Sequence, residues 1–193
     1  MIDLRSDTKT MPSEQMREAI AAAEVGDDMV AEDPTVNELQ RRSAELLGTE
    51  DALLVTSGTQ GNLAAVWTHT QPGDELICHE KAHMYHYERG GMSAVCGCLV
   101  RPISGRAGML DLYALKDAIH EGDLHTARTG LVCLENTHNL CGGVALTADY
   151  TQEVADIAHD NGIRVHLDGA RIFNASVAQD VPAASLGEPV DSV

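Results

Sequence analysis

The chain has 193 residues, of which 44% are hydrophobic, and 30 acidic against 13 basic residues give it a formal net charge of −17. This length and apolar content are typical of a globular domain with a sizeable core, and they exclude a disordered segment. The acidic balance argues against proteins that bind nucleic acid or an anionic membrane through a basic face. No apolar stretch approaches the roughly 18 residues of a membrane span, so none is expected.

The chain contains five cysteines: Cys78, Cys96, Cys98, Cys133 and Cys141. Their number is odd, no Cys-x-x-Cys pair occurs, and several lie in apolar runs. Buried free thiols in a reducing compartment explain this pattern better than disulfides do. The start of the chain is charged and lacks the apolar core of a signal peptide, so we expect a cytoplasmic protein.

Helix patterns alternate with short apolar runs along the chain. We expect helices over residues 13–23, 33–48, 61–69, 111–120 and 151–161. We expect strands over residues 52–55, 75–78, 130–134 and 163–167. The helix that begins at Asp33-Pro34 has a side-chain cap and a proline in its first turn, and Gly48 is a good stop. The alternation predicts an α/β fold with a mainly parallel sheet flanked by helices.

A turn of small and polar residues at 56–62, Thr-Ser-Gly-Thr-Gln-Gly-Asn, joins a predicted strand to a predicted helix. Its glycines let the backbone approach a ligand closely, and the unpaired N–H groups of a helix start favour a phosphate. Thr59 adds a hydroxyl donor beside Gly58. A turn of this kind is also common as a purely structural connection, so the motif alone is weak.

Three histidines lie close together in the sequence at His79, His83 and His86. In one interpretation the ring of His83 lies flat on a cofactor ring. The rival interpretation is zinc, because the spacing is ligand-like, but no carboxylate or cysteine partner completes the pattern of known sites. A plain surface cluster of histidines fits better than zinc, and we expect no metal.

The polar residues 135–139, Glu-Asn-Thr-His-Asn, follow the predicted strand 130–134. Polar residues at the carboxyl end of a parallel strand point into the usual ligand crevice of open α/β sheets. The alternative is a capped turn without a ligand. His125 and Arg128 precede the same strand, so they lie near its other end unless their loop folds back.

The most informative segment is 166–171, His-Leu-Asp-Gly-Ala-Arg. An Asp at a strand end followed by Gly-Ala-Arg is where many pyridoxal-phosphate enzymes hold the pyridine nitrogen of the cofactor. Asp168 would keep that nitrogen protonated, so that the ring accepts electrons. Such enzymes also need a Schiff-base lysine about 30 residues later. The chain's only lysines, Lys9, Lys81 and Lys116, lie upstream of Asp168.

With these motifs the chain resembles the low-specificity L-threonine aldolase and L-allo-threonine aldolase family, within the aspartate-aminotransferase fold group. The segments that carry the resemblance are 3–8, 25–28, 32–35, 57–59, 135–139 and 166–175. The resemblance implies the pyridoxal-phosphate-dependent transferase-like large domain. Residues 1–193 would form most of it, with its remainder and a C-terminal small domain absent.

The resemblance also assigns cofactor roles. Gly58 and Thr59 would hold the phosphate of pyridoxal 5'-phosphate. His83 would stack on the pyridine ring, and Asp168 would pair with its nitrogen. The Schiff-base lysine of the family would come about six residues beyond Val193, so the 193-residue chain alone is expected to be inactive.

The substrate roles follow in the same way. Ser6 and Arg171 would bind the carboxylate of a small-molecule amino acid, and His125 would lie near its hydroxyl. The implied reaction is cleavage of L-threonine or L-allo-threonine to glycine and an aldehyde, with His83 or His125 as the base. The complete protein would be a homo-oligomer, a dimer or tetramer.

The chain departs from the family's pattern at Val30 and Ala31, where an aromatic residue and glycine are common, and at Leu140, where an arginine is frequent. Two alternatives remain open. One is a β-eliminating lyase of the same fold that acts on tyrosine- or tryptophan-like substrates. The other is a non-catalytic remnant that binds a phosphate ligand or a partner chain.

Overall fold

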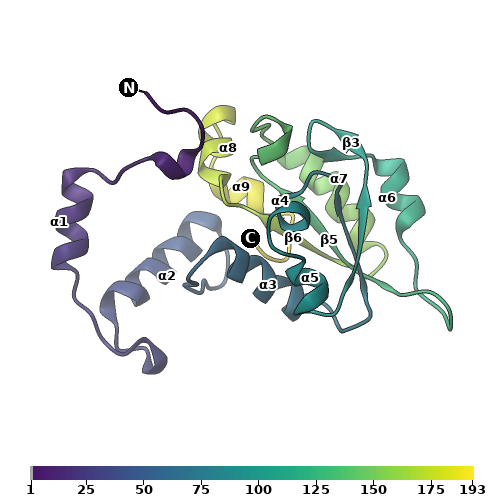
Figure 1. The fold of residues 1–193 in the computed structure, drawn as a ribbon, viewed down its shortest axis with the longest axis horizontal. Helices are drawn as coiled ribbons and strands as arrows, with labels where there is room; N and C mark the ends of the chain where they lie inside the picture. Colours follow the sequence, from purple (N-terminus) through teal and green to yellow (C-terminus); the bar gives the residue numbers. More distant parts are fainter. Residues whose placement is uncertain (1) are drawn as a thin grey trace.

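A computed structural model describes residues 2–193, and Met1 lies outside the described residues. Its main sheet contains four parallel strands in the order β2 (Leu99–Ile103), β1 (Glu75–His79), β5 (Thr129–Glu135) and β6 (Arg164–Asp168) (Figure 1). The chain therefore has the α/β architecture with a parallel sheet that the alternation of elements predicts. The register places Glu135 opposite Asp168, so β5 and β6 end together at one edge.

Helices cover both faces of this sheet. One face carries α3 (Gly58–His69), α4 (His83–His86) and α5 (Gly91–Ala94). The other carries α6 (Leu112–Ala118), α7 (Ala148–His159), α8 (Ile172–Gln179) and α9 (Ala183–Gly187). Both β1 and β5 are buried along their whole length, as expected of parallel strands that pack helices on two faces.

Alternate residues of each strand point to opposite faces of the sheet. Along β5, Leu131 and Cys133 pack with the first helix layer, whereas Val132 and Leu134 pack with the second. Each of the four is less than 5% exposed. The sheet thus separates two apolar cores, and polar residues lie at the carboxyl ends of β5 and β6.

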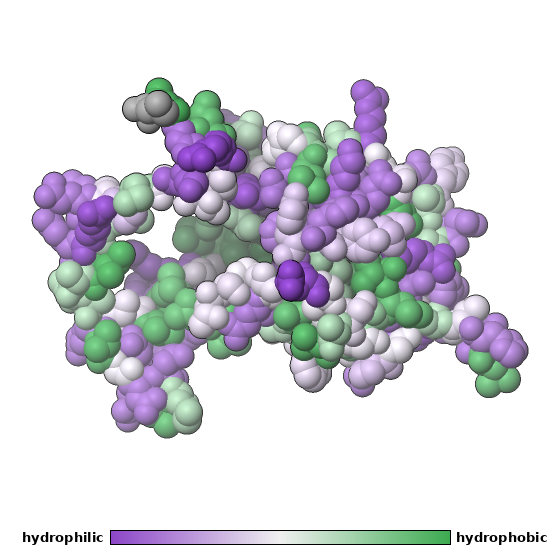
Figure 2. Space-filling view, viewed as in Figure 1, coloured by the Kyte–Doolittle hydropathy of each residue, from purple (hydrophilic) through white to green (hydrophobic). Residues whose placement is uncertain are grey.

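The N-terminal part of the chain is loosely attached to this body. It contains a 3₁₀ turn at Asp7–Lys9, α1 (Glu14–Ala22), a second 3₁₀ turn at Asp28–Val30, and α2 (Pro34–Leu47). None of the residues of α1 is buried, and the helix stands away from the sheet in Figure 1. Apolar side chains gather over α1 and α2 in Figure 2, among them Met16, Ile20, Leu39 and Leu46.

Most predicted helices and strands are confirmed within a few residues, and α2 shows why. The side chain of Asp33 accepts a hydrogen bond from the amide of Val36, and Pro34 occupies the first helical position. Gly48 ends the helix with a φ of 70°, in the left-handed region that glycine adopts without strain. None of the described helices is both long and apolar enough to cross a membrane.

The predicted strand at 52–55 is wrong, because this segment is irregular. Leu53 and Leu54 are 76% and 47% exposed, and the amide of Leu54 donates to the side chain of Gln40 instead of to another strand. At the β6 edge of the sheet, the amide of Leu167 pairs with the carbonyl of Ser192. An isolated parallel bridge thus joins Ser192 to His166 of β6.

Three strands were absent from the sequence prediction. β2 is an edge strand in which Arg101, Pro102 and partly exposed side chains interrupt the apolar run that would predict a strand. The other two, β3 (Gly105–Arg106) and β4 (Met109–Leu110), form a two-residue hairpin beside the main sheet.

Candidate active site at the carboxyl edge of the sheet

Asp168 is the last residue of β6, at the carboxyl edge of the sheet. Its Oδ1 accepts a hydrogen bond from the amide of Ala170 at 3.1 Å, and its Oδ2 accepts one from Nδ2 of Asn62 at 3.0 Å. The carbonyl of Asp168 accepts the amide of Asn136 from the neighbouring strand end. The carboxylate is therefore held in one orientation from both sides.

Asn62 connects Asp168 to His83 through a buried glutamate. The same Nδ2 donates to Oε1 of Glu88 at 2.8 Å, and that oxygen lies 3.0 Å from Nδ1 of His83. The side chain of Glu88 is 1% exposed, whereas that of His83 is 36% exposed. Polar atoms of His83, Glu88 and Asp168 all lie within 4.8 Å of one another. The structure thus brings together the two residues that the sequence predicts to contact the pyridine ring.

The main chain of His83 is fixed by a second glutamate. Its amide donates to Oε2 of Glu135 at 2.7 Å, and Oε1 of Glu135 accepts the amide of Asn139 at 2.8 Å. Burial raises the pKa of Glu135, although the two amide donors act in the opposite direction. Glu135 therefore ties the start of α4 and the loop after β5 to one strand end.

On its far side, Asn62 meets a chain of buried histidine and serine groups. Oδ1 of Asn62 lies 3.1 Å from Nε2 of His166, and Nδ1 of His166 lies 2.9 Å from Oγ of Ser192. The same hydroxyl lies 2.9 Å from Nε2 of His69. Burial lowers the pKa of His166 to about 4, against the opposing influence of Asp168. His166 is therefore a neutral ring at physiological pH.

The predicted phosphate turn lies at the start of α3, one helical turn before Asn62. Ser57 caps this helix by accepting the amide of Gln60, so the amides of Gly58 and Thr59 remain directed out of the helix start. A Cβ atom built on Gly58 would meet nothing within 4 Å. Space for a ligand and unpaired amide donors therefore coincide at the two residues that the sequence predicts.

The predicted carboxylate-binding residue Arg171 lies three residues after Asp168 and is paired with Asp7. Nε and Nη2 of Arg171 donate to the two carboxylate oxygens of Asp7 at 2.5 and 3.1 Å. This pairing lowers the pKa of Asp7 and raises that of Arg171. Ser6 precedes Asp7, and its hydroxyl accepts the amide of Thr8. The beginning of the chain is thus brought next to the end of β6.

Not every predicted residue joins this cluster. His125 lies in the exposed loop before β5, where its amide donates to Asp123. That loop is at the amino edge of the sheet, because β5 begins at Thr129 and runs parallel to β6. Within one chain, the structure does not bring His125 to Asp168, and the inward fold of the loop considered above does not occur.

The three clustered histidines do not converge on one point. Nε2 of His86 bonds the carbonyl of Glu80, and His83 faces Glu88. The ring of His79 packs edge-on against His138 at 4.9 Å. Nδ1 of His79 accepts the amide of Lys81, so a neutral His79 carries its proton on Nε2. The sequence spacing is therefore not the spacing of a single ligand set.

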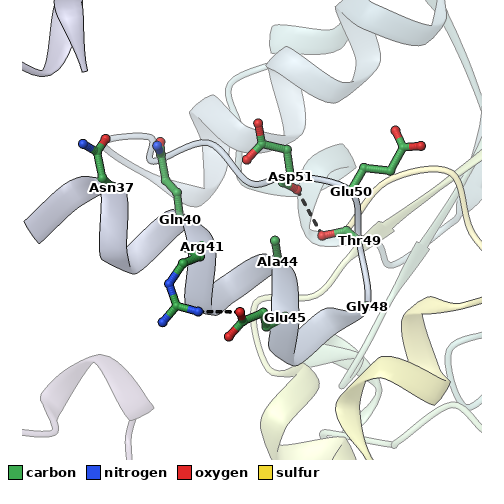
Figure 3. A pocket seen from close by; sticks show the side chains of 9 residues that line it. All are labelled: Asn37, Gln40, Arg41, Ala44, Glu45, Gly48, Thr49, Glu50 and Asp51. Carbon is green, nitrogen blue, oxygen red and sulfur yellow. Dashed lines mark hydrogen bonds and ion pairs between the residues drawn. The ribbon is translucent and has the colours of Figure 1, made fainter. Parts of the chain in front are cut away.

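A surface hollow lies away from this edge of the sheet, between α2 and the irregular segment that follows it. It has a volume of about 610 Å³ and is lined by polar groups (Figure 3). Arg41 points toward Glu45 and Thr49 bonds the carbonyl of Asp51, so these groups satisfy one another. No predicted site residue lines this hollow, and it coincides with the loosely packed N-terminal part.

Comparisons with known proteins agree with the geometry at the carboxyl edge. The chain is 44% identical over 196 residues to a probable low-specificity L-threonine aldolase of Arabidopsis thaliana, covering 100% of this chain and 55% of the relative. It is also 44% identical over 193 residues to the low specificity L-threonine aldolase of Escherichia coli K12, covering 100% of this chain and 57% of that protein. The chain thus spans about half the length of these curated relatives.

A solved structure of a Leishmania major threonine aldolase superposes with a TM-score of 0.77 at 25% identity, over 92% of this chain and 52% of that one. The family model described as beta-eliminating lyase matches residues 3–193. With nearly the whole chain matched, and with the predicted pyridine-contacting residues adjacent in the fold, the chain belongs to the beta-eliminating lyase family and is similar throughout to its threonine aldolases.

Proposed function

We propose that this chain forms the cofactor and substrate face of an enzyme that cleaves β-hydroxy-α-amino acids, such as L-threonine or L-allo-threonine, to glycine and an aldehyde. The observation that carries the proposal is the connected set of Asp168, Asn62, Glu88 and His83 at the carboxyl edge of the sheet. It lies one helical turn from the phosphate turn at Gly58, in a family of lyases.

Enzymes of this family depend on pyridoxal 5'-phosphate. The residues present fit that group. Gly58 and Thr59 offer amide donors beside open space, and Asp168 offers a carboxylate already oriented by Asn62. When bound, the cofactor supplies an electron sink for the Cα–Cβ bond that breaks. Asp168 would hold a proton on the pyridine nitrogen, and His83 would cover one face of the ring.

The substrate residues are Arg171 and Ser6 at one end of the site and His83 at the other. The planar fork of Arg171 matches a carboxylate, as its contact with Asp7 illustrates within the chain. His83 is half-buried, so its outer nitrogen is within reach of a ligand, and an imidazole nitrogen is a suitable group for removing the proton from the β-hydroxyl. Within one chain His125 lies at the amino edge of the sheet, so its predicted role near the substrate hydroxyl would have to be filled by another copy of the chain.

We also propose that the protein acts as a homo-oligomer in the cytoplasm. The support for oligomerisation comes from the segment before α2, residues 2–33, which we call the N-terminal arm. Its side chains Met16, Ile20 and Met29 are 58%, 70% and 92% exposed, and α1 buries no residue. A second copy that covers this arm would remove an apolar surface that monomers rarely expose. The support for a reducing compartment is that all five cysteines are free.

The test uses the full protein that contains this chain, loaded with pyridoxal phosphate. Asp168→Asn should reduce acetaldehyde release from L-threonine and L-allo-threonine by several orders of magnitude, because the neutral amide no longer stabilises the protonated nitrogen. Asp160→Asn, which removes an exposed carboxylate at the end of α7, is the matched control and should keep activity. Equal turnover in Asp168→Asn and wild type would refute the electron-sink role. Release of pyruvate from tyrosine or tryptophan, without aldol cleavage, would favour the β-eliminating alternative.

A further inference from the structure

We propose that Glu88 is a positioning residue that holds the neutral ring of His83 with its proton on Nδ1, which leaves the lone pair of Nε2 as the atom that takes a proton from the substrate. The role of Nε2 rests on the function proposed above. The tautomer itself is a property of this chain and can be measured without any reaction.

The two carboxylates beside Asn62 fix the orientation of its side-chain amide. Its Nδ2 is 2.8 Å from Oε1 of Glu88 and 3.0 Å from Oδ2 of Asp168. Carboxylates only accept hydrogen bonds, so the end of Asn62 that faces both of them must be its NH₂ group. Each amide hydrogen is then used by one carboxylate. The opposite end, Oδ1, can only accept.

The contacts on the other side of Asn62 are compatible with that orientation. Because Oδ1 accepts, Nε2 of the neutral His166 must donate, and its Nδ1 must accept from the hydroxyl of Ser192. The oxygen of Ser192 then accepts from Nε2 of His69. Every group along this line has a consistent donor and acceptor. Rotating the Asn62 amide would set its oxygen against the two carboxylates of Glu88 and Asp168.

Glu88 also determines which nitrogen of His83 carries the proton. Oε1 of Glu88 accepts from Asn62, and its second contact is Nδ1 of His83 at 3.0 Å, which must therefore carry a proton. The other oxygen of Glu88, Oε2, is buried and has no hydrogen-bond partner among residues 2–193. No other donor therefore draws the carboxylate of Glu88 away from its contacts with Asn62 and His83. A neutral His83 then presents Nε2 as an acceptor, and Nε2 has no hydrogen-bond partner within the described chain.

This arrangement reverses the intrinsic preference of the ring. A neutral imidazole side chain in water favours the proton on Nε2, the form that cannot accept a proton at its outer nitrogen. A buried carboxylate beside Nδ1 favours the other form, because a hydrogen bond to a charged group is stronger than one to water. Glu88 touches neither cofactor nor substrate in this account and acts through the ring that it orients.

The experiment measures the His83 tautomer by ¹⁵N-histidine NMR in mildly alkaline buffer, with His83→Gln used to assign the signal. The wild type should show a protonated Nδ1 and an unprotonated Nε2. Glu88→Met removes the acceptor but fills the buried space, and it should shift the tautomer ratio toward Nε2–H by about tenfold or more. Glu88→Gln is the matched variant, since an amide oxygen in the position of Oε1 still accepts from Nδ1, and it should retain the wild-type tautomer.

The outcomes separate the two proposals. A wild-type ring with its proton on Nε2, or an unchanged tautomer in Glu88→Met, would overturn the positioning role whatever the enzyme does. If the tautomer responds as expected, the kcat for aldol cleavage should fall about tenfold in Glu88→Met with a smaller change in KM, and Glu88→Gln should recover most of it. If the His83 tautomer changes in Glu88→Met but the wild-type protein has no aldolase activity, the positioning role of Glu88 stands and the proposed function is refuted. A poorly folded Glu88→Met protein shifts the decision to the wild-type tautomer, which alone supports or overturns the assignment.

Discussion

Replacing His166 with glutamine should remove one defined contribution to the acid sensitivity of the fold. His166 is 3% exposed, and burial lowers its pKa from 6.5 to about 4, with a further lowering from His69 and an opposing influence from Asp168. As the pH falls, the unfolded chain therefore binds a proton at this ring at a higher pH than the native protein does. Stability from the neutral ring is complete above pH 6.5 and is lost as the pH falls from 6.5 toward 4.

The size of the effect follows from these two pKa values. At about pH 5 the preference of the proton for the unfolded state amounts to about 2 kcal/mol for this single ring. Urea unfolding at about pH 7.5 and about pH 5 measures it. The stability difference between wild type and His166→Gln should change by about 2 kcal/mol between these conditions, in favour of the variant at low pH. His125→Gln, in the exposed loop before β5, controls for the loss of a histidine. Parallel pH profiles for wild type and His166→Gln would show that the ring is not held neutral by burial.

Three further outcomes are expected. Arg171→Lys should raise the KM for the amino acid about tenfold with little change in cofactor affinity, because lysine keeps the charge but loses the fork that also contacts Asp7; equal damage to both would place Arg171 elsewhere. Asn136→Ala should lower the free energy of unfolding in urea by about 2–4 kcal/mol, since its buried side chain bonds both the amide and the carbonyl of Leu146; a loss below about 1 kcal/mol would show that water replaces those bonds. Borohydride reduction of this 193-residue chain with pyridoxal phosphate, followed by peptide mapping, should label none of its three lysines stoichiometrically, and one fully labelled lysine with aldol cleavage would contradict that expectation.

The sequence predicted the positions of the site residues on strand ends better than it predicted how they connect. Asp168 could be placed because an apolar run ends there and parallel strands finish at a common edge. Asn62 and Glu88 could not be recognised in the same way. Each is a polar residue in a helix or turn, and its role depends on a partner 106 or 26 positions away. The available signal was weak: Asn62 follows the phosphate turn by one helical turn, on the same side of the helix.

The wrong strand prediction at residues 52–55 has a physical cause of the same kind. Residues 52–55 have strand composition, but a strand exists only where a neighbour completes its hydrogen bonds, and here Gln40 takes that place for Leu54. The substrate role of His125 rests on resemblance alone and stays a prediction; within one chain, its position before β5 places it at the opposite edge of the sheet. At residues 52–55 the composition favours a strand, and the neighbouring helix decides the outcome.

The contact between Asp7 and Arg171 has a consequence for the order in which the protein is made. The two residues are 164 positions apart, and α1 between them buries nothing. During synthesis the arm is made before the strands of the sheet, and Arg171 must also emerge before this contact can form. The arm is therefore tied to the sheet only after β6 is complete. Because the apolar side chains of α1 stay exposed even in the folded chain, a chaperone that binds apolar segments of nascent chains would have access to this arm throughout the synthesis of the sheet.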